Sequence, residues 1–150
     1  MNITNDFQEI LYYAHYWNWA PDWLVVKNIY EKIPESYSVL TPFAYAYLEE
    51  LIRSTPSEYG RELLDENGNP KRRKVGLGLI KLAKEENNKN LEYIEKLDEI
   101  EKYFDNSTDL DSGDNRNSVD HGYMHPRFWT QESFESLIHD IAIMSKYSRF

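Results

Sequence analysis

The sequence lacks cysteine, lacks long apolar runs and is short of positive charge. The absence of cysteine excludes disulfides and thiolate chemistry. No stretch approaches the roughly 18 apolar residues that a membrane span needs. The first residues also lack the basic segment and apolar run that mark a secretory signal. We therefore expect a soluble, cytoplasmic protein.

Acidic residues outnumber basic ones by 26 to 17, which gives a formal net charge of −9. Proteins that bind nucleic acid usually present a basic face, so this composition excludes general binding to polyanions. A nucleic acid would have to be bound at a local positive site, against the repulsive field of the remaining surface.

The sequence does contain enough apolar material for a core. Hydrophobic residues make up 41% of the chain and aromatic residues 15%, including twelve Tyr, six Phe and four Trp. Disordered chains are poor in such residues, and 150 residues are most simply one domain. We expect residues 1–150 to form a single domain.

Apolar residues recur at helical spacing along most of the chain. A polar stretch at 85–90 is either a break or an exposed turn, and residues 75–79 would also suit a short strand. Thr41 is expected to cap one helix with Pro42 as its first residue, and Thr130 to cap the last helix. The predicted helices cover about residues 4–18, 21–33, 41–52, 79–104 and 130–144.

Two polar segments separate these helices. Residues 54–70 carry the turn signal Asn67-Gly68 and are expected to form a loop or a small hairpin. Residues 105–115 have no apolar period and are expected to form a loop. The result is an all-α fold of five to six helices with little or no sheet. Short connections favour antiparallel neighbours, so we predict an up-and-down bundle.

The segment between the second loop and the last helix carries the most distinctive residues. It reads Asn-Arg-Asn-Ser-Val-Asp-His-Gly-Tyr-Met-His-Pro-Arg over residues 115–127. Within it, Arg116 is followed by Asn117, three variable residues, then His121 and Gly122. This pattern resembles the Arg-polar-x3-His motif of the HEPN superfamily, in the form associated with toxins and anti-phage defence. The resemblance in residues covers this segment only.

The residue types suit RNA cleavage without a metal ion. That reaction needs a base, an acid and positive charge on the phosphate. His121 can act as acid or base near neutral pH, and Arg116 offers a planar charged fork for phosphate oxygens. Asn117 would position one of them. On an ideal helix Arg116 and His121 lie about 140° apart, whereas Asn117 and His121 share a face.

The resemblance implies further properties. It implies a HEPN-like bundle, cleavage to a 2′,3′-cyclic phosphate, no cofactor and no metal. It also implies a homodimer that brings two motifs into one cleft, because one chain supplies only one motif histidine. An antitoxin or other inhibitor protein is compatible with this family context.

Other polar residues are candidates for binding RNA. Tyr123, His125 and Arg127 would line the rim of the site. The only basic run is Lys71, Arg72, Arg73 and Lys74, which either grips phosphates or is a solvated surface stretch. Glu49 and Glu50 could orient His121, although nothing in the sequence singles them out.

Two alternatives remain open at this point. One is a catalytically silent helical module that binds a partner protein or a nucleotide through aromatic residues, which otherwise belong to a core or dimer interface. The other is a metal-dependent hydrolase built on His121, Asp120 and His125, because the two histidines have i, i+4 spacing. The aromatic residues are Tyr12, Tyr13, His15, Tyr16, Trp17, Trp19 and Trp23.

Overall fold

The computed structural model describes residues 2–108, 111–122 and 124–150. It confirms an all-α fold, and the described part of the chain contains no β-strand. The expected count of five to six helices is wrong, because the described residues form seven α-helices. These are α1 (Ile3–Tyr13), α2 (Ala20–Lys32), α3 (Tyr37–Arg53), α4 (Gly76–Glu86), α5 (Leu91–Ile100), α6 (Arg116–Asp120) and α7 (Gln131–Ser145). Short 3-10 turns cover Pro34–Ser36, Glu101–Phe104 and Pro126–Phe128.

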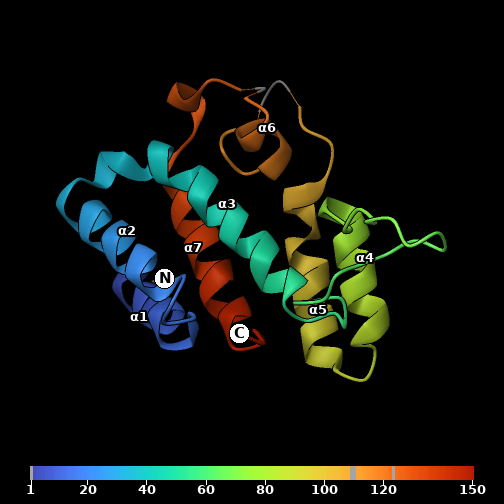
Figure 1. Cartoon of the computed structure of the whole chain (residues 1–150). Coiled ribbons are helices and arrows are strands. Elements are labelled where there is room, and N and C mark those ends of the chain that lie inside the picture. Colours follow the sequence, from blue (N-terminus) through green and yellow to red (C-terminus); the bar gives the residue numbers. More distant parts are fainter. Residues whose placement is uncertain (1, 109–110, 123) are drawn as a thin grey trace.

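The last helix lies at the centre of the bundle (Figure 1). Helix α7 packs between α1 and α3, so the first and last helices are in contact. His139 of α7 and Asp6 of α1 strengthen that contact, with Nδ1 3.1 Å from Oδ1. Helix α2 packs on α1 at one edge, and α4 and α5 lie on the other side of α3. The core therefore surrounds α3 and α7, whose apolar faces are buried.

The first and third helices differ from their predicted ranges. Helix α1 ends at Tyr13, and the carbonyl of His15 then accepts hydrogen bonds from three backbone N–H groups in a tight turn. Trp17 consequently lies outside the helix and is largely exposed. Thr41 is not a cap, since α3 begins at Tyr37 and the Thr41 hydroxyl donates to the Tyr37 carbonyl at 2.7 Å. Pro42 is thus inside the helix.

The segment from 75 to 104 forms two helices rather than one. Asn90 starts α5, because its Oδ1 accepts a hydrogen bond from the N–H of Tyr93. The strand alternative for residues 75–79 is wrong, since α4 already begins at Gly76. The preceding loop contains the expected small hairpin, with a single bridge between Leu64 and Pro70. No helix in the described residues is long and apolar enough to cross a membrane.

Candidate functional site

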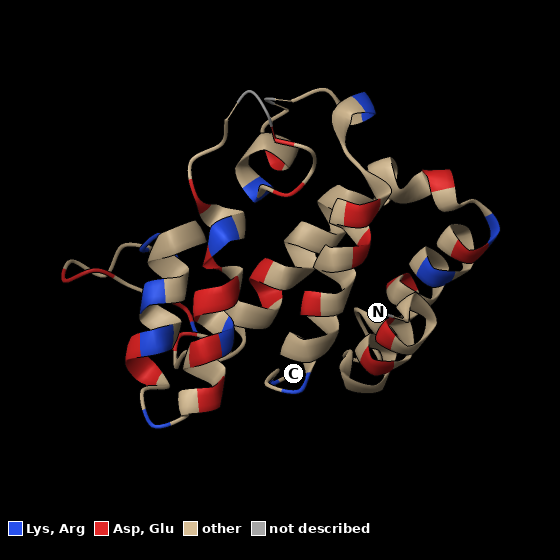
Figure 2. Ribbon diagram, turned by 180° about the vertical axis from the view of Figure 1, so that it is seen from behind, with Lys and Arg blue, Asp and Glu red and all other residues tan. Residues whose placement is uncertain are grey.

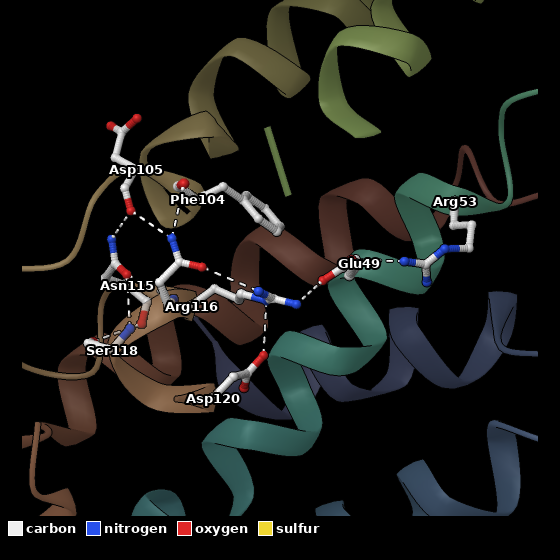
Figure 3. Close-up of polar contacts among 9 residues, drawn as sticks. Glu49, Arg53, Phe104, Asp105, Asn115, Arg116, Ser118 and Asp120 are labelled. Carbon is white, nitrogen blue, oxygen red and sulfur yellow. Dashed lines mark hydrogen bonds and ion pairs between the residues drawn. The ribbon is translucent and has the colours of Figure 1, made fainter. Parts of the chain in front are cut away.

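Helix α6 carries the Arg-polar-x3-His motif and is only five residues long. Its start is fixed by Asn115, whose Oδ1 accepts from the N–H groups of Asn117 and Ser118 at 2.9 and 3.2 Å. The Asn115 amide donates to the carbonyl of Asp105 at 2.9 Å. An asparagine at this position satisfies N–H groups that the helix leaves unpaired. The motif therefore sits on a capped helical turn (Figure 3).

The side chain of Asn117 is bonded to the backbone at the end of the preceding helical segment. Its amide donates to the carbonyls of Asp105 and Phe104 at 3.1 and 3.4 Å. Its Oδ1 accepts from Nη1 of Arg116 at 3.3 Å. Asn117 thus links α6 to the segment before it and contacts Arg116, so it can help to position the arginine side chain.

The chain just before α6 is also packed tightly. Gly113 has a φ of +88°, and a Cβ built there would lie 2.8 Å from Cβ of Trp129. The hydroxyl of the buried Tyr45 donates to the Gly113 carbonyl at 2.9 Å. A glycine suits such a close approach and a positive φ. These contacts join the loop before the motif to α3 and to the segment before α7.

Arg116 is held by a carboxylate from a distant part of the chain. Its Nη2 lies 2.7 Å from Oε2 of Glu49, which is on α3 and only 5% exposed. The other oxygen of Glu49 lies 2.8 Å from Nη2 of Arg53. Arg53 also reaches Glu50 at 3.0 Å. Glu49 therefore bridges two arginines and joins α6 to α3 (Figure 3).

Sequence reasoning missed this role of Glu49. The carboxylate was a candidate for orienting His121, whereas in the structure it binds Arg116. No signal in the sequence connects the two residues, which lie 67 positions apart. Arg53 was not a candidate at all.

Asp120 completes the surroundings of Arg116. Its Oδ2 lies 3.0 Å from Nε of Arg116, but that nitrogen is buried without hydrogen-bond geometry to any described residue. The contact is therefore electrostatic. Burial raises the pKa of the Asp120 carboxyl above its ordinary value, and this effect outweighs the lowering by Arg116.

Replacing Asp120 by asparagine should maintain or raise the free energy of unfolding at pH 7. A raised pKa means that the folded state favours the protonated acid. The stability that the protonated Asp120 carboxyl contributes is therefore lost as the pH rises. The loss begins near the pKa of this carboxyl in the unfolded chain and is complete above its higher pKa in the folded protein. The advantage of Asp120→Asn over the wild type should shrink below about pH 4 in urea unfolding. A variant that is less stable at pH 7 would show that attraction to Arg116 outweighs burial.

His121 follows α6 directly and is exposed. Its backbone N–H donates to the Asn117 carbonyl at 3.2 Å, which places it at the end of the helical turn. Within the described residues its side chain makes no hydrogen bond or ion pair, and its positive charge lowers the pKa of the adjacent Asp120 carboxyl. Gly122, with a φ of +64°, then turns the chain away. The imidazole is thus exposed at the end of the helical turn that begins with Arg116.

Comparisons with protein-family models, curated proteins and solved structures find no match. The likeness to HEPN proteins therefore rests on the residues of the motif segment.

The rim residues lie on the segment after α6. The Nδ1 atom of His125 accepts from the N–H of Arg127 at 3.1 Å and caps the turn Pro126–Phe128. The Arg127 guanidinium lies over the ring of Phe128. Tyr123 lies outside the described residues. Arg127 is exposed, whereas the ring of His125 accepts a hydrogen bond from the backbone of the turn that follows it.

The two histidines of the metal alternative do not share a helix. Helix α6 ends at Asp120, and the chain turns at Gly122 before it reaches His125. The i, i+4 spacing therefore does not stack the two imidazoles. Across the described parts of the chain, no three His, Asp or Glu side chains are grouped so as to hold a metal ion.

The basic run lies at the end of the hairpin loop and is exposed throughout. Arg73 joins the end of the loop to its beginning, because its guanidinium donates to the carbonyls of Glu58 at 2.8 Å and of Arg61. Arg73 also lines an open cavity of about 420 Å³ with Arg53 and Tyr59. The run is linked to the motif through Arg53, which shares Glu49 with Arg116. Lys71, Arg72 and Lys74 leave their charges at the surface.

The aromatic cluster divides into buried and exposed members. Trp23 is fully buried against Phe43 and Tyr47 in edge-on contacts. By contrast, Tyr12, Tyr16 and Trp17 are each at least 70% exposed. The cluster is thus a core element at one end and a surface at the other. It lies in and beside α1 and α2, whereas the motif lies on α6.

Proposed function

We propose that this chain is a metal-independent endoribonuclease of HEPN type with a HEPN-like bundle. One observation carries the proposal. Helix α6 holds Arg116 against Glu49, Asp120 and Asn117, and leaves His121 exposed at its end. A held cation and an exposed imidazole on the same helical turn are two of the three groups that metal-free phosphodiester cleavage requires.

In this mechanism one His121 takes the proton of the ribose 2′-hydroxyl. The oxygen attacks the adjacent phosphorus, the bond from phosphorus to the 5′-oxygen breaks, and that oxygen takes a proton from an acid. The products are a 2′,3′-cyclic phosphate and a 5′-hydroxyl. Arg116 stabilises the charge that grows on the phosphate oxygens.

The second acid–base group would come from a second copy of the chain. The described residues of one chain present a single motif histidine, and His125 is engaged in capping. A homodimer that pairs two α6 segments would supply the missing proton donor. An acidic toxin of this type would be restrained in the cell by an antitoxin, which the resemblance allows.

The basic run would guide RNA toward α6. It stands against an overall charge of −9, so its cations supply the local attraction that an RNA strand needs. The cavity between Arg53 and Arg73 connects this run to the network around Arg116. Tyr59 lines the same cavity and offers a ring for a base.

A second candidate function is a catalytically silent binding module. One observation favours it: Arg116 is already paired with two carboxylates and is only 18% exposed. In that case the arginine would serve only to dock α6 on α3, and the exposed aromatic residues would bind the partner. Such a protein would retain its fold and cleave no RNA.

The test is a cleavage assay on single-stranded RNA in the presence of excess chelator. The proposal expects cleavage to continue and each upstream fragment to end in a 2′,3′-cyclic phosphate. Cleavage that stops with chelator would instead support the metal-dependent alternative. Absence of cleavage at all concentrations, in a folded sample, would leave the binding module as the function.

A further inference from the structure

Helix α2 buries one apolar face and leaves other apolar side chains exposed beside it. Trp23, Val26 and Tyr30 point into the core and are buried. On the outer face, Val25 and Ile33 are more than half exposed. Ile29 is exposed as well, and Val25, Ile29 and the C-cap residue Ile33 form a strip at four-residue spacing, whereas the exposed Leu24 lies on another side of the helix. A monomeric protein rarely leaves such a strip in water, and it commonly marks an interaction surface.

Helix α2, like α4, carries no net charge in this acidic chain. Asp22 and Glu31 balance Lys27 and Lys32, so the helix is neutral in a protein of net charge −9. Figure 2 shows both colours along this edge helix. An identical acidic molecule would be repelled from most of the surface, but it can approach a neutral strip without that cost.

The two ends of α2 carry opposite charges that are not used within the chain. Lys27 pairs with Glu31 at 3.0 Å, whereas Asp22 and Lys32 join no ion pair within the described residues. They lie about 15 Å apart along the helix, given its rise per residue. Two antiparallel copies of α2 would therefore place Asp22 of each opposite Lys32 of the other. The same antiparallel register places Val25 of one copy opposite Ile29 of the other.

We propose that the outer face of α2 binds a second copy of this chain across a two-fold axis. In such an interface the same patch meets itself, so each contact occurs twice. A parallel arrangement would bring Asp22 beside Asp22 and is disfavoured. Because α2 and α6 lie on different sides of α3 (Figure 1), this contact is separate from motif pairing and independent of the RNA chemistry.

The first test measures self-association by sedimentation of the full chain. The wild type should sediment at a multiple of 17.9 kDa. Val25→Glu should weaken this association by about tenfold or more, because it desolvates a charge in the strip. Leu91→Glu, at a more exposed apolar residue on α5, should leave it unchanged. Circular dichroism spectra of both variants would serve as the control that they fold like the wild type. A monomeric wild type, or a Val25→Glu variant that associates normally, would overturn the proposal.

A charge exchange identifies the occupant. Asp22→Lys or Lys32→Asp alone sets like charges against each other and should weaken association. The double variant, and an equimolar mixture of the two single variants, should restore it. Only a second copy of the chain gives this restoration, so failure of both would refute the antiparallel self-contact. Since Val25 is not part of the motif, Val25→Glu should retain any RNA cleavage, which keeps the two proposals separable.

Discussion

The His121→Ala variant is expected to lose RNA cleavage by a factor of about 10² to 10⁴ while its thermal stability stays unchanged. The first effect follows because a positioned acid or base contributes a rate factor of that size. The second follows because the imidazole is exposed and bonded to no described residue. Cleavage rates on a single-stranded RNA and a thermal melt measure the two quantities on the same sample.

His125→Ala is the matched control for this prediction. His125 is exposed and lies four residues further along, but its ring caps a backbone turn. The ribonuclease mechanism expects a much smaller loss from this change than from His121→Ala. Equal losses would instead indicate that the two imidazoles act together, as in a metal site. Full activity in His121→Ala would remove the motif from the mechanism.

Glu49→Gln is expected to lower the free energy of unfolding by about 2 kcal/mol. Removing one partner of a buried ion pair commonly costs 3–5 kcal/mol. The smaller figure applies here because Arg116 retains Asp120, Arg53 retains Glu50, and both arginines are partly exposed. In a domain of this size, such a loss lowers Tm by roughly 4–8 °C. Thermal and urea unfolding would measure it.

Glu50→Gln provides the comparison for Glu49→Gln. Glu50 is the adjacent carboxylate on α3, but it is more exposed and pairs with Arg53 only. An exposed pair contributes about 0–1 kcal/mol, so this variant should melt close to the wild type. Glu49→Gln should also slow RNA cleavage, because Arg116 loses the group that aims it. Equal melting temperatures for the two variants would contradict the bridging role of Glu49.

The helices could be predicted from sequence because their apolar residues repeat at the helical period. The helical period identifies the apolar positions of a helix, but it does not show which of those side chains are buried in the fold. The predicted helix over 21–33 includes Ile29 and Ile33 among its apolar positions, although both side chains are exposed. The helical period also extended the first helix to Trp17, since a turn held by the carbonyl of His15 has no apolar signature.

In the candidate site, too, local features could be predicted from the sequence and contacts between distant segments could not. Arg116 and His121 were identifiable because their types and spacing are local properties of the chain. Glu49 was not, because its pairing with Arg116 depends on how α6 docks on α3. The asparagines are an intermediate case: Asn117 was expected to position a neighbour, but its bonds to the carbonyls of residues 104 and 105 required the fold.

The contact between α1 and α7 governs when this protein can fold. Helix α1 precedes every other described helix along the sequence, yet its buried face is completed by α7. Without α7, Phe7 is covered only in part, by Trp23 and Tyr30 of α2. Contacts so distant in sequence form slowly, and partly made chains expose apolar surface. The bundle therefore closes only when α7 meets α1, and a partly folded chain exposes apolar surface that favours aggregation.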